Sequence, residues 1–138
     1  MHYAYQFTVE PSHTASSPLE ESLKLGSGIL KRVQIFFPDG CSKLVKCCLW
    51  NNWEQLAPTN PDGYYALDGA AADAALYYDM DEDTNQLWFI AWTVGSKYNH
   101  EITIHLEVQG RDEPDPFKIM TLMKDTINRL IDLMRSVL

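Results

Sequence analysis

The class of fold is decided by the stretch ITIHLEV, residues 102–108, in which apolar and polar residues alternate without a break. Successive side chains of a β-strand point to opposite faces, so this period of two is typical of a half-buried strand. The apolar positions are Ile102, Ile104, Leu106 and Val108. The stretch therefore predicts a strand of an antiparallel sheet that covers a core with one face.

Other strand-like segments precede this stretch at short intervals. Residues 29–37 and 44–50 are rich in residues that favour strands, and residues 87–94 are apolar on both faces, which is typical of a fully covered strand. Residues 70–75 are mostly alanine, so we expect a helical turn or an irregular loop there. In the segment at residues 29–37, the side chains predicted to face the core are Ile29, Val33, Ile35 and Phe37.

Seven or eight such segments, separated by turn residues and with no helix between them, predict a mainly β protein. We expect an antiparallel β-sandwich, jelly-roll-like, with an N-terminal strand arm and a C-terminal amphipathic helix. The predicted parts are an arm and linker at 1–18, the sandwich at 19–110, and a hinge with an oligomerisation helix at 111–138.

The N-terminal strand is predicted by Tyr3, Tyr5, Phe7 and Val9, which alternate with smaller or polar residues. Residues 11–18 begin and end with proline and are rich in serine and threonine, which indicates a linker or surface loop. The strand is therefore predicted to be a separate arm. Strand exchange between subunits through Tyr3, Tyr5 and Phe7 is one expectation for it.

The C-terminal segment changes to a helical period. Asp115 is a candidate helix cap and Pro116 suits the first helical position. Spacings of three and four then predict about three heptads, whose apolar seam favours oligomerisation. Packing of the same seam against the chain's own sandwich is the alternative. The seam consists of Met120, Met123, Ile127, Leu130, Met134 and Val137.

Charge and apolar run length exclude several classes of partner. The 11 basic and 19 acidic residues give a net charge of −8, which repels phosphate backbones and disfavours nucleic-acid binding. No apolar run approaches the ~20 residues that cross a bilayer, and the helix lacks the dense basic face of a membrane-surface helix. Residues 1–10 lack the pattern of a secretory signal, so we expect a protein that is made and kept in a cytoplasm, or one that is released only by lysis.

Catalytic and metal-binding patterns are weak. Residues 79–85 alternate acidic residues like a calcium loop, but Thr84 stands where glycine is needed and Ile90 where the bidentate glutamate is needed. His100 and His105 are five apart on a strand and therefore face opposite sides. No motif for nucleophilic or nucleotide chemistry is present, and Cys41, Cys47 and Cys48 form no disulfide framework. We expect no enzyme, no metal and no cofactor.

Aromatic side chains offer a second functional hypothesis, a carbohydrate-binding or adhesion β-sandwich module. Sugar rings stack on aromatic faces, and four tryptophans and a Tyr64–Tyr65 pair are available. Trp88 and Trp92 share one face of a strand that is predicted to be buried, so we expect them in the core. Trp53 with Tyr64 is then the remaining candidate pair.

Several landmarks occur in a recognisable order. A strand ends in Phe37-Pro38 with Gly40 just after, and residues 58–63 form a loop. An aromatic strand with Trp92 and a turn with His100 follow, before the alternating strand. This order resembles small jelly-roll proteins encoded beside capsid genes in tailed bacteriophages, over more than half of the chain, although its motifs specify a fold more than a task.

The resemblance implies a capsid decoration (cement) protein or another virion-associated protein. Its expected partners are further copies of the chain, with a trimer favoured, and the major capsid protein. Its expected location is the capsid surface of a virion, after synthesis in the host cytoplasm. The predicted function is therefore that of a non-enzymatic viral structural protein, with the carbohydrate-binding module as the alternative.

Overall fold

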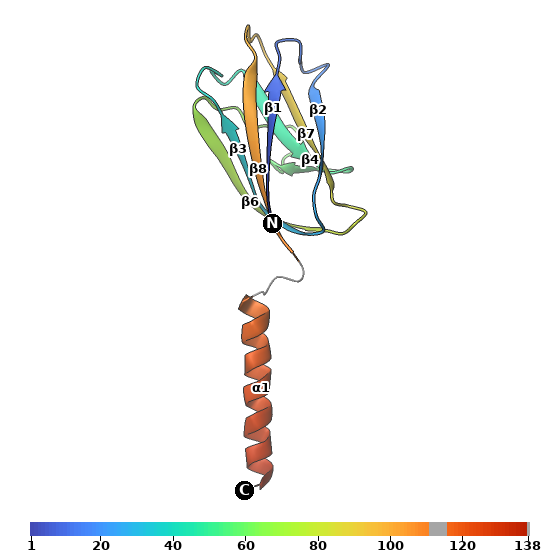
Figure 1. Cartoon of the computed structure of the whole chain (residues 1–138), viewed down its shortest axis with the longest axis vertical. Coiled ribbons are helices and arrows are strands. Elements are labelled where there is room, and N and C mark those ends of the chain that lie inside the picture. Colours follow the sequence, from blue (N-terminus) through green and yellow to red (C-terminus); the bar gives the residue numbers. More distant parts are fainter. Residues whose placement is uncertain (111–115, 138) are drawn as a thin grey trace.

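The computed structural model of the chain describes residues 1–110 and 116–137, which form eight strands and one helix (Figure 1). The strands precede the helix without interruption, as the alternating segments predict. Their bounds are β1 (His2–Val9), β2 (Leu19–Lys24), β3 (Gly28–Phe37), β4 (Val45–Trp50), β5 (Gln55–Ala57), β6 (Ala70–Met80), β7 (Gln86–Thr93) and β8 (His100–Gln109).

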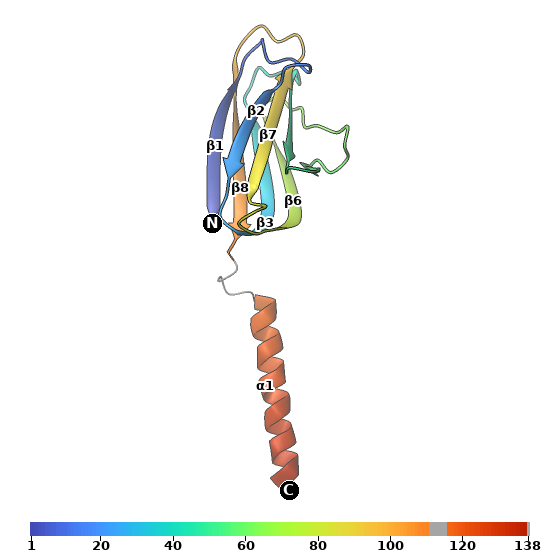
Figure 2. The same cartoon turned by 90° about the vertical axis from the view of Figure 1, so that its right-hand side faces the viewer.

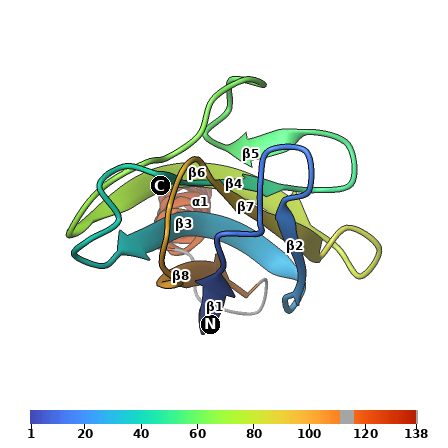
Figure 3. The same ribbon diagram turned by 90° about the horizontal axis from the view of Figure 1, so that it is seen from above.

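The strands form two four-stranded antiparallel sheets, ordered β1-β8-β3-β6 and β2-β7-β4-β5. The pairs β1–β8, β2–β7, β3–β6 and β4–β5 are those of one long hairpin folded over on itself. This strand order is the eight-stranded jelly roll. The predicted mainly β, jelly-roll-like sandwich is therefore confirmed, and Figure 3 shows its two layers from above.

The core lies between the two sheets and consists of the inward side of each strand. In β8 the four apolar positions of the alternating stretch are buried and the polar positions between them are not, as predicted. The largest fully buried side chains include Phe89, Leu30, Ile35, Leu49, Met80, Leu87, Ile102, Ile104 and Leu106. These side chains give the sandwich a core that does not depend on the helix.

The inward face of β3 differs from the prediction at its beginning. The pairing of β3 with both neighbours shifts register between Leu30 and Arg32, which is a β-bulge. Because the bulge adds one residue to the strand, the alternation changes phase at this point. Leu30 is therefore fully buried, whereas Ile29, which was predicted to face the core, lies partly exposed on the other side.

The alanine-rich stretch at residues 70–75 is a strand rather than the predicted helical turn or loop. It forms the first half of β6, where Ala70 to Ala75 pair with residues 32–37 of β3. Pairing with a long neighbouring strand overrides the intrinsic preference of alanine for helix, which is worth only a fraction of a kcal/mol per residue. β6 is an edge strand of the first sheet.

The N-terminal strand is part of the sandwich and not a separate arm. All eight residues of β1 pair with β8 of the same chain, from His2 opposite Glu107 to Val9 opposite His100. The N-terminal amine also donates to the backbone oxygen of Val108. The local alternation predicted the strand correctly, but the proline-bounded linker after it is a crossing from the first sheet to β2 in the second.

The helix α1 (Pro116–Val137) stands apart from the sandwich, on the side where β8 ends (Figures 1 and 2). Every residue from Met120 to Val137 is exposed. The alternative in which the seam packs against the chain's own sandwich is therefore not what the structure shows. The predicted hinge at 111–115, with the candidate cap Asp115, lies outside the described residues.

Candidate functional site

The predicted seam forms an exposed apolar stripe along α1. Met120, Met123, Ile127, Leu130, Met134 and Val137 are between 52% and 85% exposed, and we call these six residues the heptad stripe. Leu122, Ile131 and Leu133 are exposed beside it. Nine large apolar side chains in contact with solvent on one helix form a patch that soluble monomers rarely carry.

The charges of the helix lie away from the heptad stripe. Lys124, Asp125, Arg129, Asp132 and Arg135 all occupy positions other than the first and fourth of the heptads. A helix with one apolar stripe and one charged side is built to bury the stripe against another surface. A shallow hollow between successive turns of the stripe is lined by Leu122, Met123, Thr126 and Ile127.

The side chains predicted for strand exchange face the core of their own chain. Tyr3, Tyr5 and Phe7 are partly buried and pack against the core cluster. The ring of Phe7 stacks on Phe89 of the second sheet at 5.3 Å between centroids, and the Tyr3 hydroxyl accepts a hydrogen bond from the Gly26 amide at 2.8 Å. Their exchange between subunits stays a prediction, and it requires these contacts to be broken first.

A second candidate site lies on the outer face of the second sheet. Three residues of β4 stand directly opposite three residues of β7 there, in the pairs Lys46–Trp92, Cys48–Ile90 and Trp50–Trp88. Trp88 and Trp92, which were predicted to be core residues, are partly exposed on this outer face. Only the alternate residues of β7, such as Phe89, face the core, so the core covers the inner side of this sheet.

The loop after β5 covers part of this outer face, and Gln55 holds it in place. The Gln55 amide nitrogen lies 2.7, 3.1 and 2.8 Å from the backbone oxygens of Pro58, Asn60 and Gly63. Further along, Tyr65 exchanges two backbone hydrogen bonds with Cys47 of β4. The loop projects from the sandwich in Figure 2 and returns to β4 through this bridge.

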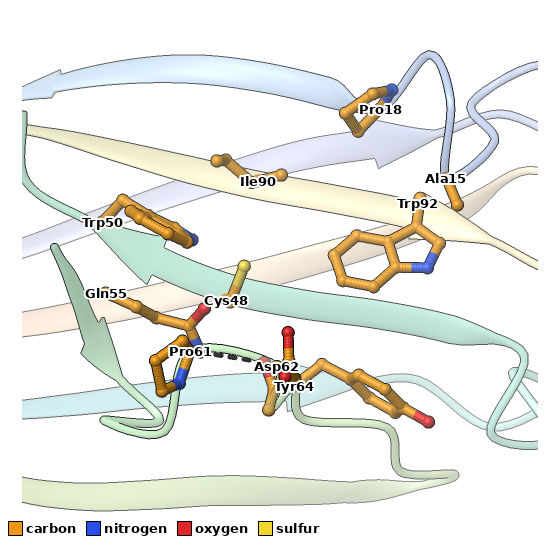
Figure 4. A pocket seen from close by; sticks show the side chains of 11 residues that line it. Ala15, Pro18, Cys48, Trp50, Gln55, Pro61, Asp62, Tyr64, Ile90 and Trp92 are labelled. Atoms are coloured by element: carbon orange, nitrogen blue, oxygen red, sulfur yellow. Dashed lines mark hydrogen bonds between the residues drawn. The ribbon is translucent and has the colours of Figure 1, made fainter.

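Loop and sheet border an open hollow of about 380 Å³, which we call the first hollow (Figure 4). Tyr64 is fixed at its border, because its ring meets Trp92 edge-on at 5.8 Å and lies 4.4 Å from the Lys46 ammonium group. Trp53, predicted as the partner of Tyr64, is 73% exposed and is not part of the lining. The lining consists of Ala15, Pro18, Cys48, Trp50, Gln55, Pro61, Asp62, Gly63, Tyr64, Ile90 and Trp92.

The acidic and histidine-containing segments have structural roles. The Asp81 carboxylate accepts hydrogen bonds from the amides of Asp83 and Thr84, which closes the turn between β6 and β7. This turn crosses from β6 in the first sheet to β7 in the second. His100 is buried and its Nε2 lies 3.0 Å from the Ser96 hydroxyl. Among the described residues, no group of three potential ligands surrounds a metal position.

The cysteines are free thiols that lie buried in or near the second sheet. Burial raises the pKa of Cys47 well above its ordinary value and also raises the pKa of Cys41 and Cys48. A raised pKa disfavours the thiolate, which is the reactive form. In the part of the chain that the structure describes, no helix is long and apolar enough to cross a membrane.

The class that the structure defines is a jelly-roll domain followed by an exposed amphipathic helix. Neither a protein-family model nor a curated protein matches the chain. Among solved structures, it is similar to PliG, a periplasmic inhibitor of g-type lysozyme from Aeromonas hydrophila, with 12% identity, a TM-score of 0.40, and coverage of 79% of this chain and 85% of that one. It is also similar to the Yersinia pseudotuberculosis-derived mitogen, with 12% identity, a TM-score of 0.46, and coverage of 84% and 92%.

Proposed function

We propose that this protein is a non-enzymatic structural module whose copies assemble through α1. The observation that carries the proposal is the heptad stripe, which runs from Met120 to Val137 and is exposed at all six of its positions. The regular three-and-four spacing is the pattern by which helices pack side by side as a coiled coil. A second copy of the same helix is therefore the partner that this surface fits.

The stability of α1 supports the same conclusion. Helix formation has a costly nucleus, and most helices in proteins owe their stability to the packing of an amphipathic face against another surface. The heptad stripe supplies such packing only when it is covered. Its side chains are at least half exposed, so covering them stabilises the assembly by about 1 kcal/mol per residue.

The width of the apolar surface favours three chains over two. Ile131 and Leu133 lie on either side of the heptad stripe and are 41% and 62% exposed. A two-stranded coiled coil buries a narrow seam, whereas a bundle buries a wider one. A parallel trimer would gather three sandwiches at one end, since each sandwich precedes the N-terminal end of its helix.

The test is the solution mass of a variant with two charges in the heptad stripe. Ile127→Asp with Leu130→Asp is expected to give a folded monomer, because burial of unpaired carboxylates costs more than the helices gain. The matched control, Asn128→Asp with Ser136→Asp, adds the same charge outside the stripe and is expected to keep the mass of the parent chain. An unchanged mass for the first variant would refute assembly through α1.

We further propose that the assembled module decorates a capsid surface by binding the major capsid protein. What supports this more specific role is the jelly-roll body, the assembly helix and the resemblance described above. Several weak contacts made together by linked copies give strong attachment without a large interface on any one of them. Co-sedimentation with capsids assembled from the major capsid protein of the same genome tests it, and a failure to co-sediment would contradict it.

A further inference from the structure

The outer face of β4 and β7 contains a second hollow beside the first, and neither is used by the assembly helix. The second hollow is about 180 Å³ and is lined by Glu20, Trp50, Asn51, Asn52, Trp88 and Ile90. Trp50 and Ile90 line both hollows. The two therefore form one elongated groove with Trp50 between its halves, which we call the aromatic groove.

The groove presents tryptophan side chains at two levels along the paired strands. Trp50 and Trp92 are separated by the length of four residues along the paired strands, which is about 13 Å at the rise of a β-strand. The side chains of Cys48 and Ile90 lie between them (Figure 4). This spacing suits a chain-like ligand whose flat, partly apolar units contact tryptophans at both levels.

Several hydrogen-bond acceptors lie at the edges of the groove. Gln55 is only 6% exposed, and its nitrogen is committed to the backbone of the loop. Gln55 lines the first hollow, and its amide oxygen points toward Cys48 in Figure 4. Asp62 adds a carboxylate to the first hollow and Glu20 adds one to the second.

This combination selects a ligand class. Small-molecule sites combine apolar walls with a few placed polar groups and have volumes of ~300–1,000 Å³, which the first hollow meets. Hydroxyl groups donate to the Gln55 oxygen and to the two carboxylates, while C–H faces pack on the aromatic rings. The carboxylates and the net charge of −8 repel phosphorylated, sulfated or uronic acid ligands.

We propose that the aromatic groove binds a neutral oligosaccharide of at least three sugar units. One unit lies in the first hollow against Trp92 and Tyr64. Because a single sugar unit is shorter than the ~13 Å between Trp92 and Trp50, a later unit of the same chain contacts Trp50 and Trp88. The site belongs to the sandwich and does not depend on assembly through α1. It also differs from the pair expected from the sequence, because Trp53 lies outside it.

The experiment measures the binding of four neutral tetrasaccharides to the full chain, namely those of cellulose, amylose, chitin and mannan. Isothermal titration gives the affinity, and the indole signals in NMR spectra identify the tryptophans that respond. Trp92→Ala and Trp50→Ala are expected to weaken binding at least about tenfold each. The matched control Trp53→Ala removes an exposed indole outside the groove and is expected to bind like the parent chain.

Two safeguards separate loss of the site from loss of the fold. Far-UV circular dichroism and the melting temperature are compared for each variant, and Trp92→Phe, which keeps an aromatic face, is expected to retain part of the affinity. The proposal is overturned if none of the four sugars binds at about 10 mM, well above a ~1 mM dissociation constant. It is equally overturned if Trp53→Ala weakens binding while the groove variants do not, or if a tryptophan-rich peptide binds the groove and the sugars do not.

Discussion

Replacement of Gln55 by leucine tests how the loop over the first hollow is held. The Gln55 side chain is buried, and its amide nitrogen is the donor for the backbone oxygens of Pro58, Asn60 and Gly63. Leucine has a similar size but no donor, so these oxygens lose a partner that no neighbouring group replaces. We expect the loop to loosen and the sandwich to lose stability.

The size of the effect follows from the hydrogen bonds. An amide nitrogen has two hydrogens, so the three short distances correspond to two full bonds at a time, each worth about 0.5–1.5 kcal/mol net. The oxygens of Pro58 and Asn60 lie on a partly exposed loop and regain water when Gln55 is replaced. The expected loss is therefore about 2 kcal/mol in the free energy of unfolding, or ~6–12 °C in melting temperature.

The assay is urea unfolding followed by tryptophan fluorescence, at one fixed protein concentration because assembly also contributes to stability. Gln86→Leu is the matched control, since Gln86 makes a single exposed hydrogen bond to Ser22 at 2.8 Å. We expect the control to lose less than about 0.5 kcal/mol. A loss of that small size for Gln55→Leu, or equal losses for both variants, would refute the assigned role of Gln55.

Three further predictions concern the fold, the thiols and the coupling of the two sites. Gly28→Ala is expected to lower the free energy of unfolding in denaturant by about 3 kcal/mol, because φ is +152° and the added carbon would overlap the backbone oxygen of Gln109. Gly40→Ala is the control, because the added carbon meets open space there, and it should lower the free energy of unfolding by only about 1 kcal/mol. Burial raises the pKa of the Cys47 thiol, so iodoacetamide should label Cys47 in urea but not in the folded chain. The free energy of unfolding should fall as the pH rises above ~8.5, the pKa of an unfolded thiol, because only the unfolded chain then releases the proton. The parent chain should remain on an immobilised oligosaccharide about 100-fold longer than the Ile127→Asp, Leu130→Asp variant, because assembled copies bind through several aromatic grooves at once. Equal retention of the two proteins would contradict this coupling between assembly and sugar binding.

The sequence predicted the elements whose period is regular and local. The alternation of β8 and β1 and the heptads of α1 lie within single segments, and these elements occur where they were expected. The bulge in β3 and the strand at residues 70–75 depend on pairing with distant segments. Alanine favours helix over strand, so it is the pairing with β3 that makes this part of β6 a strand.

The candidate sites were predictable to different degrees for the same reason. The heptad stripe could be read directly, because a helix places residues three and four apart on one face. The aromatic groove could not, because a strand that is apolar on both faces resembles one covered on both sides. A signal was nevertheless present in β7, because Trp88 and Trp92 are an even number of residues apart and therefore lie on the same face of the strand. Trp50 of β4 stands opposite Trp88 and shares this outer face.

The most direct test of assembly through α1 is the solution mass of the full chain and of a chain that ends at Gly110, both by light scattering. The full chain is expected to give a multiple of its 15.8 kDa, with three copies favoured, and the shortened chain a folded monomer. Because the sandwich has its own core, the shortened chain should still give the circular dichroism spectrum of a folded β protein. A full chain that has a mass of 15.8 kDa at every protein concentration measured would contradict the proposal.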